Sequence, residues 1–252
     1  MGRSDGERII IVCPSKGRCD NVKTTLLIPS VTLIVPQSEE EDYKRCNPNT
    51  QVIGTPPEVR GITKTRQWVL DHFEEVFMID DDVINVRKNF ENESQKVWVT
   101  DAEQILEIIN ETVYIAREIG AKVFSFSRTV NPLSFSGHEL FSHTGYMNAS
   151  YCGFLKGHGL SYDLTMNEGE DHYMSCLNMF KHRYCLIDER YSFMTDGNFK
   201  SKGGCNGQRT RESMIKNTMH LREIFGEVVT FKEPNAVKKN VNIGERTLKF
   251  PY

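Results

Sequence analysis

Near the end of its first third the chain carries four apolar residues that lead directly into three carboxylates, Val76-Phe77-Met78-Ile79-Asp80-Asp81-Asp82. A short apolar run of this kind predicts a buried β-strand that reaches the surface at its C-terminal end. In open α/β sheets, ligands bind at that end of the strands. Side-chain alternation predicts that Asp80 and Asp82 lie on one side of the extended chain and Asp81 on the other.

Three adjacent aspartates repel one another unless a cation or solvent compensates their charge. Two of them, Asp80 and Asp82, are candidate ligands for Mg²⁺ or Mn²⁺, which prefer carboxylate oxygens and bind well where a substrate diphosphate completes the coordination. The alternative is a solvated acidic turn. The strongly apolar strand favours the metal site, and Asp81 is then expected only to shape the turn.

Strands alternate with helices along the chain. Strands are predicted over 9–13, 31–35, 51–54, 76–79, 84–87, 122–126, 151–156, 183–187 and 191–194, and the main helices over 61–73, 101–119, 173–180 and 210–225. This order predicts a single α/β domain with a doubly wound, mostly parallel but mixed sheet flanked by helices. Residues 129–150 have no clean period, and a connection of this length inside a compact domain is usually functional or disordered.

The first predicted strand ends in Pro14-Ser15-Lys16-Gly17-Arg18. Lys16 and Arg18, with exposed backbone N–H groups beside them, suit the diphosphate or the base edge of a nucleotide. The loop is neither a Walker loop nor a G-x-G-x-x-G turn, so a basic surface turn is the alternative.

A second acidic group, Glu170-Asp171, stands before a predicted helix and is followed by His172. Acids at this position are favoured by the helix dipole, and N-capping alone explains many of them. Carboxylates beside a histidine are also candidates for a general base.

Composition places the chain among ordinary soluble globular proteins. Its 252 residues are 38% hydrophobic, with a net charge of −3 and seven cysteines that form no C-x-x-C pair. No apolar run approaches the ~20 residues of a membrane span, so a cytoplasmic location is expected. Residues 200–252 hold 11 Lys/Arg and 5 Glu. We therefore expect a core over 1–199 and a basic C-terminal helix and tail over 200–252, packed on the same domain.

These motifs together resemble the GT-A fold glycosyltransferases over about residues 9–195. The P-S-K-G-R loop and the M-I-D-D-D strand end look most like phage glycosyltransferases that act on hydroxymethylpyrimidine bases in DNA. The resemblance implies that Asp80 and Asp82 hold the metal, with Ser15, Lys16, Arg18, Arg66 and Asp80 at the nucleotide. Asp171 is the implied acceptor base, with Glu170 as its alternative. Many members complete the metal site with a C-terminal histidine, and His220 is the only histidine after residue 182.

The expected function is transfer of a sugar from a nucleoside diphosphate sugar, UDP-glucose or similar, to a hydroxyl acceptor. A 5-hydroxymethylpyrimidine in double-stranded phage DNA is the expected acceptor. Such a base must be flipped out of the duplex, and aromatic residues of the irregular segment (Phe135, Phe141, Tyr146) are candidates to stack on it. The alternatives are a glycan or small-molecule acceptor, a sugar-nucleotidyltransferase, or a non-enzymatic nucleic-acid-binding protein. The last two are disfavoured because no Gly-rich signature follows the first strand and because the net charge is −3.

Overall fold

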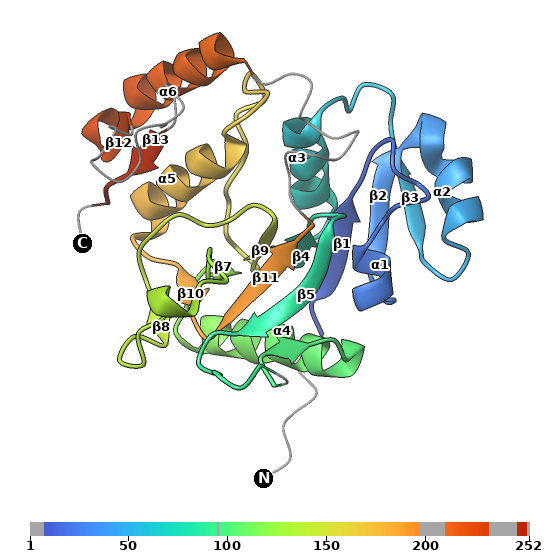
Figure 1. The fold of residues 1–252 in the computed structure, drawn as a ribbon. Helices are drawn as coiled ribbons and strands as arrows, with labels where there is room; N and C mark the ends of the chain where they lie inside the picture. The colour runs from blue at the N-terminus through green and yellow to red at the C-terminus, as the bar shows by residue number, and fades with distance from the viewer. Residues whose placement is uncertain (1–7, 95, 197–209, 232–245, 251–252) are drawn as a thin grey trace.

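Apolar β-branched and aromatic residues form the centre of an eight-stranded mixed sheet in the computed structural model, which describes residues 8–94, 96–196, 210–231 and 246–250 (Figure 1). The strands of this sheet follow the order β3-β2-β1-β4-β9-β7-β10-β8. They are β1 (Ile10–Pro14), β2 (Thr32–Pro36), β3 (Val52–Thr55), β4 (Val76–Ile79), β7 (Val123–Phe126), β8 (Phe141–Ser142), β9 (Tyr151–Phe154) and β10 (Leu186–Asp188). The prediction of a mixed α/β sheet in one domain is confirmed.

Parallel pairing dominates one half of the sheet. Strands β1, β2, β3 and β4 run parallel, with Ile10 opposite Val76 and Val12 opposite Met78. Strand β9 is antiparallel to both of its neighbours, β4 and β7. A smaller sheet of order β11-β5-β6 contains β5 (Val83–Lys88), β6 (Trp98–Val99) and β11 (Tyr191–Thr195). The two-residue strands β6 and β8 are not predicted from the sequence, because two residues are too few to show a period.

Helices cover both faces of the main sheet. They are α1 (Thr24–Leu27), α2 (Glu40–Cys46), α3 (Ile62–His72), α4 (Ala102–Glu118), α5 (Glu170–His182) and α6 (Arg211–Phe225), with short 3-10 turns η1 (Gln37–Glu39), η2 (Pro132–Ser134) and η4 (Gly226–Val228). Helix α4 lies below the sheet in Figure 1, and α3 and α5 lie above it. Helix α4 is capped by Asp101, whose side chain accepts a hydrogen bond of 2.8 Å from the backbone N–H of Gln104.

Strand β4 is fully buried, and its side chains alternate between two cores. Phe77 and Ile79 belong to the cluster that includes Ile105 and Ile109 of α4. Val76 and Met78 belong to the cluster that includes residues of α3 and α5. Burial on both faces and pairing on both edges fix the strand firmly, so the acids that follow it leave the sheet at a defined point.

The C-terminal part contributes α6 and a hairpin of β12 (Val229–Phe231) and β13 (Arg246–Leu248). A third core cluster joins Leu221 of α6 and Val229 of β12 to Met166 and to Cys176 of α5. Residues 197–209 and 232–245, which hold much of the basic tail, lie outside the described residues. No helix among the described residues is long and apolar enough to cross a membrane.

Candidate functional site

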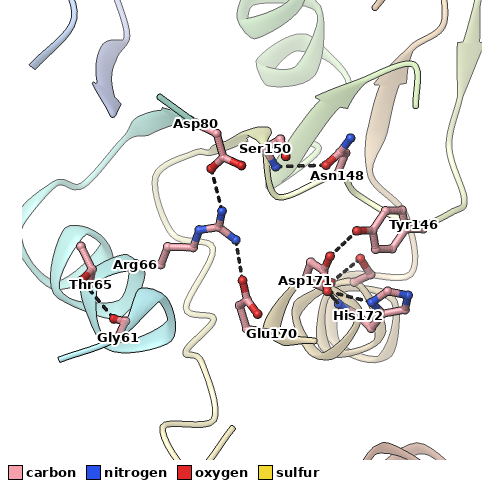
Figure 2. A network of polar contacts seen from close by, with 11 residues as sticks. Gly61, Thr65, Arg66, Asp80, Tyr146, Asn148, Ser150, Glu170, Asp171 and His172 are labelled. Atoms are coloured by element: carbon pink, nitrogen blue, oxygen red, sulfur yellow. Dashed lines mark hydrogen bonds and ion pairs between the residues drawn. The ribbon is translucent and has the colours of Figure 1, made fainter. Parts of the chain in front are cut away.

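A buried arginine joins the acid run after β4 to the acid pair at the start of α5. Arg66, on α3, donates from Nη2 to Asp80 Oδ1 at 2.9 Å and from Nη1 to Glu170 Oε1 at 2.8 Å (Figure 2). The Arg66 side chain is only 5% exposed. Burial of the guanidinium opposes its charge, but the two carboxylates outweigh burial and raise the pKa of Arg66. The sequence predicts a nucleotide contact for Arg66, and the structure places it as the link between the two acidic groups.

Asp81 has a larger role than the sequence suggests. Its carboxylate accepts hydrogen bonds from Ser15 Oγ at 2.5 Å and from Arg18 Nη1 at 2.7 Å. Its backbone carbonyl accepts from the N–H of Lys23 at 2.8 Å. Burial raises the pKa of the Asp81 carboxyl, although the bonds from Ser15 and Arg18 act against that rise. The expectation that Asp81 only shapes the turn is therefore wrong, because its side chain holds the loop that follows β1.

That loop is also fastened to α2. The Tyr43 hydroxyl lies 2.8 Å from Ser15 Oγ and accepts from the backbone N–H of Arg18 at 3.0 Å. The N–H of Gly17 donates to Glu39 at 2.7 Å, and Gly17 adopts φ 69°, a conformation that favours glycine. Lys16 is exposed. The nucleotide contacts predicted for Ser15, Lys16 and Arg18 remain predictions.

Asp82 has the properties expected of a metal ligand. Its Oδ1 is buried and makes no hydrogen bond with the described residues. Burial, followed by repulsion from Asp80 and Asp81, raises the pKa of Asp82 to about 6. A divalent cation would neutralise the crowded charge and occupy the unpaired oxygen, so Asp80 and Asp82 fit Mg²⁺ or Mn²⁺.

The structure does not bring His220 to these carboxylates. The Nε2 atom of His220, on α6, lies 2.7 Å from Asp163 Oδ2. Among the described residues no group of three or more His, Cys, Asp or Glu side chains is arranged to hold a metal ion.

The two acids of α5 point in different directions (Figure 2). Glu170 faces Arg66, whereas Asp171 accepts hydrogen bonds from the Tyr146 hydroxyl and from His172, whose backbone N and Nδ1 each lie 2.7 Å from Asp171 Oδ1. Burial acts to raise the pKa of Asp171, but His172 and Tyr146 outweigh it and hold the pKa well below its usual range. Asp171 is thus an ionised carboxylate with a fixed orientation.

Two residues near Asp171 carry no sequence signal for this position. Tyr146 lies in the irregular segment, where it is expected to stack on a base, but its ring is 4.6 Å from that of His172 and has the Arg128 guanidinium over it at 5.8 Å. Arg246, on β13, lies against the backbone of Gly169 and helps to lower the pKa of Asp171. Only the three-dimensional fold shows that these side chains meet α5.

For the other two predicted stacking residues, Phe141 and Phe135, contact with a base stays a prediction. Phe141 has the Arg190 guanidinium 4.9 Å from its ring centroid, so this face of the ring is covered. Phe135 is half-buried.

Distant structural likenesses to this chain occur among solved structures. A search of curated proteins finds no match. Among solved structures, residues 1–349 of TarS from S. aureus share 10% identity at a TM-score of 0.49, with 85% of this chain and 65% of that chain covered. A197 from STIV shares 11% identity at a TM-score of 0.42, with 76% of this chain and 86% of that chain covered. The chain thus spans just under two thirds of the TarS fragment.

The sequence itself matches the family model described as TET-Associated Glycosyltransferase over residues 9–204. This range includes β1, the acid run after β4 and the acid pair of α5. The chain therefore belongs to the TET-associated glycosyltransferase family.

Proposed function

We propose that this chain transfers a sugar from a nucleoside diphosphate sugar, such as UDP-glucose, to a hydroxyl group, with Mg²⁺ or Mn²⁺ bound by Asp80 and Asp82. The observation that carries the proposal is the Asp80–Arg66–Glu170 bridge. It sets a strand end suited to a cation and a diphosphate beside an oriented carboxylate, Asp171. Sugar transfer needs both groups at one place.

The leaving group is a nucleoside diphosphate, whose developing negative charge must be neutralised. The bound cation would supply most of this neutralisation. Lys16, which is exposed, and Arg18, at the edge of the same loop, are our candidates to bind the phosphates. Neutralisation of the diphosphate in a site that excludes water would stabilise a transition state of oxocarbenium character.

The acceptor hydroxyl must lose a proton as its oxygen attacks the sugar. We assign the acceptance of this proton to Asp171. The alternative, Glu170, already accepts a charged hydrogen bond from the buried Arg66, which holds its carboxylate on the Asp80 side of the site. A positioned carboxylate typically accelerates such a step by ~10²–10⁴-fold.

We further propose that the acceptor is a 5-hydroxymethylpyrimidine in double-stranded DNA. This proposal rests on the resemblance of the P-S-K-G-R and M-I-D-D-D motifs and on the positive charge of residues 200–252, which hold 11 Lys/Arg and 5 Glu. Cations of that region would bind backbone phosphates and offset the few kcal/mol needed to flip the base.

The test incubates the protein with UDP-glucose, Mn²⁺ and DNA that contains hydroxymethylcytosine, then digests the DNA and analyses the nucleosides by mass spectrometry. We expect a hexose adduct that is absent with Asp82→Ala. If no common UDP-sugar and no hydroxymethylated base gives an adduct, the DNA acceptor is wrong. Release of UDP without DNA modification would retain the donor and point to a glycan or small-molecule acceptor.

A further inference from the structure

Two thiols lie in contact beside the loop that follows β1. The Sγ atoms of Cys19 and Cys46 are 3.3 Å apart, and their side chains are half-buried and exposed, respectively. Cys19 directly follows Arg18, and Cys46 is the last residue of α2. The remaining cysteines among the described residues (Cys13, Cys152, Cys176, Cys185) are all buried. Spacing in the sequence gives no hint that Cys19 and Cys46 meet, since 27 positions separate them.

Several bonds between the loop and α2 hold these sulfurs together. Asn47 Nδ2 donates to the carbonyl oxygen of Cys19 at 2.9 Å and to that of Tyr43 at 3.1 Å. The Tyr43 hydroxyl, one turn earlier in α2, accepts from the N–H of Arg18 at 3.0 Å. A disulfide has an S–S bond of about 2.05 Å, so the sulfurs need to approach by little more than ~1 Å. These hydrogen bonds hold the loop against the end of α2 next to the two sulfurs.

A shared metal ion is a weaker explanation for this pair. Structural zinc sites need four ligands. No third His, Cys, Asp or Glu of the described residues joins Cys19 and Cys46 in a group that could hold a metal. We therefore interpret Cys19 and Cys46 as two thiols in contact.

We propose that Cys19 and Cys46 form an oxidative modification site, which closes to a disulfide on reaction with a peroxide. The exposed Cys46 thiol would react first, and hydrogen peroxide would convert it to a sulfenic acid with release of one water. The Cys19 sulfur then attacks the Cys46 sulfur, and the hydroxyl leaves with the Cys19 proton as a second water. Two thiols are oxidised, the peroxide is reduced, and a thiol reductant reverses the reaction.

The bond would act on the donor site through the loop, a consequence that rests on the proposed function. Arg18 is bonded to Asp81 in the structure, and it must leave this carboxylate to bind a diphosphate. A disulfide one residue away restrains the Arg18 backbone against α2 and favours the Asp81 pair. Oxidation should therefore weaken donor binding.

The experiment uses the full chain with Cys205→Ser, which removes the cysteine that lies outside the described residues. After mild treatment with hydrogen peroxide, peptide mapping without reduction should find Cys19 linked to Cys46. Calorimetry with UDP-glucose and Mn²⁺ should give a dissociation constant raised about fivefold or more, at the lower end of typical coupling between two sites. Dithiothreitol should restore it, and the Cys46→Ser variant should bind the donor equally well before and after peroxide.

Absence of the linked peptide would overturn the modification site. A linked peptide with unchanged donor affinity, or an equal change in Cys46→Ser, would overturn the effect on the donor loop. If the reduced protein binds no UDP-sugar at all, the proposed function fails instead, while peptide mapping still decides the disulfide.

Discussion

At Arg66 a single guanidinium is bonded to two carboxylates that come from different elements, Asp80 after β4 and Glu170 at the start of α5. Breaking a buried ion pair from one side leaves uncompensated charge and typically costs about 3–5 kcal/mol. We expect Arg66→Met to lower the free energy of unfolding by about this amount, measured by urea denaturation.

The matched control for this substitution is Arg45→Met. Arg45 pairs with Asp42 at 2.6 Å, but its side chain is 74% exposed. Exposed pairs contribute about 1 kcal/mol or less, so this variant should remain close to wild type. Equal losses in the two variants would show that the buried bridge has no special role.

Replacement of Tyr146 tests whether its hydroxyl orients Asp171, the proposed acceptor base. Its hydroxyl donates to Asp171, and a hydrogen bond to a charged group contributes about 1.5–3 kcal/mol. Tyr146→Phe should lower kcat about tenfold or more and leave the donor dissociation constant unchanged, because we propose that the donor binds on the Asp80 side. It should also raise the pKa of Asp171, which loses one donor to its charged form.

Steady-state kinetics at saturating donor, together with calorimetry of donor binding, check this expectation. Tyr114→Phe, an exposed change on α4, is the control. An effect confined to donor affinity would contradict the assigned role of Tyr146.

The sequence predicts the acidic residues of the site better than their partners. Asp80, Asp82, Glu170 and Asp171 can be proposed from the sequence because acids at a strand end or a helix start leave a local pattern. The partners of Asp81 leave none, since Ser15 is 66 positions away and Arg18 is 63. Contacts at such separation depend on how β1 and β4 pair, which no local period contains.

At the scale of elements, boundaries with chemical signals are predicted well. Asp101 caps α4, and Thr210 caps α6 through a reciprocal bond with Ser213. Strand direction has no comparable signal. The sequence predicts β9 as a strand, but its apolar pattern fits either direction, and only pairing with β4 and β7 shows that it runs antiparallel.

Gly153 explains how β9 fits between its neighbours. A Cβ at this position would lie 1.9 Å from an atom of the Phe124 ring, which packs across the strand from β7. We expect Gly153→Ala to cost about 1–3 kcal/mol of unfolding free energy through overpacking. The measurement is the urea midpoint at unchanged m-value.

Gly137→Ala is the matched control, since a Cβ there meets nothing within 4 Å. Its midpoint should shift little. A loss equal to that of Gly153→Ala would assign the effect to glycine replacement in general rather than to the Phe124 contact.

At the scale of the whole molecule, the distribution of charge predicts a different salt dependence for each of the two proposed substrates. The body is acidic and residues 200–252 hold an excess of cations, 11 Lys/Arg against 5 Glu. If duplex DNA is the acceptor, its KM should rise steeply with salt, because each phosphate contact contributes about −0.9 to the slope of log affinity against log salt. The KM for the donor, whose binding we propose to depend on the metal and on short-range hydrogen bonds, should change much less. Equal salt slopes for both substrates would contradict phosphate binding by this region.

Binding of the proposed cation at Asp80 and Asp82 should raise the stability of the whole fold. The raised pKa of Asp82, about 6, means that the folded chain binds this proton more tightly than the unfolded chain. The stability that protonation of Asp82 contributes is therefore present at low pH and is lost as pH rises through about 6. Above that pH the carboxylate is charged, and its buried Oδ1 makes no hydrogen bond with the described residues.

Mn²⁺ should consequently raise the melting temperature at pH 7.5 and have little effect at pH 5, where protons compete for Asp82. Saturation at 100 times the dissociation constant corresponds to about 2.7 kcal/mol. For a chain of this size, each kcal/mol corresponds to about 2–4 °C. Thermal unfolding with and without Mn²⁺ at the two pH values measures the effect, and Asp82→Ala should abolish it while remaining folded. An equal shift in Asp82→Ala would place the cation elsewhere and leave Asp80 and Asp82 without their proposed role.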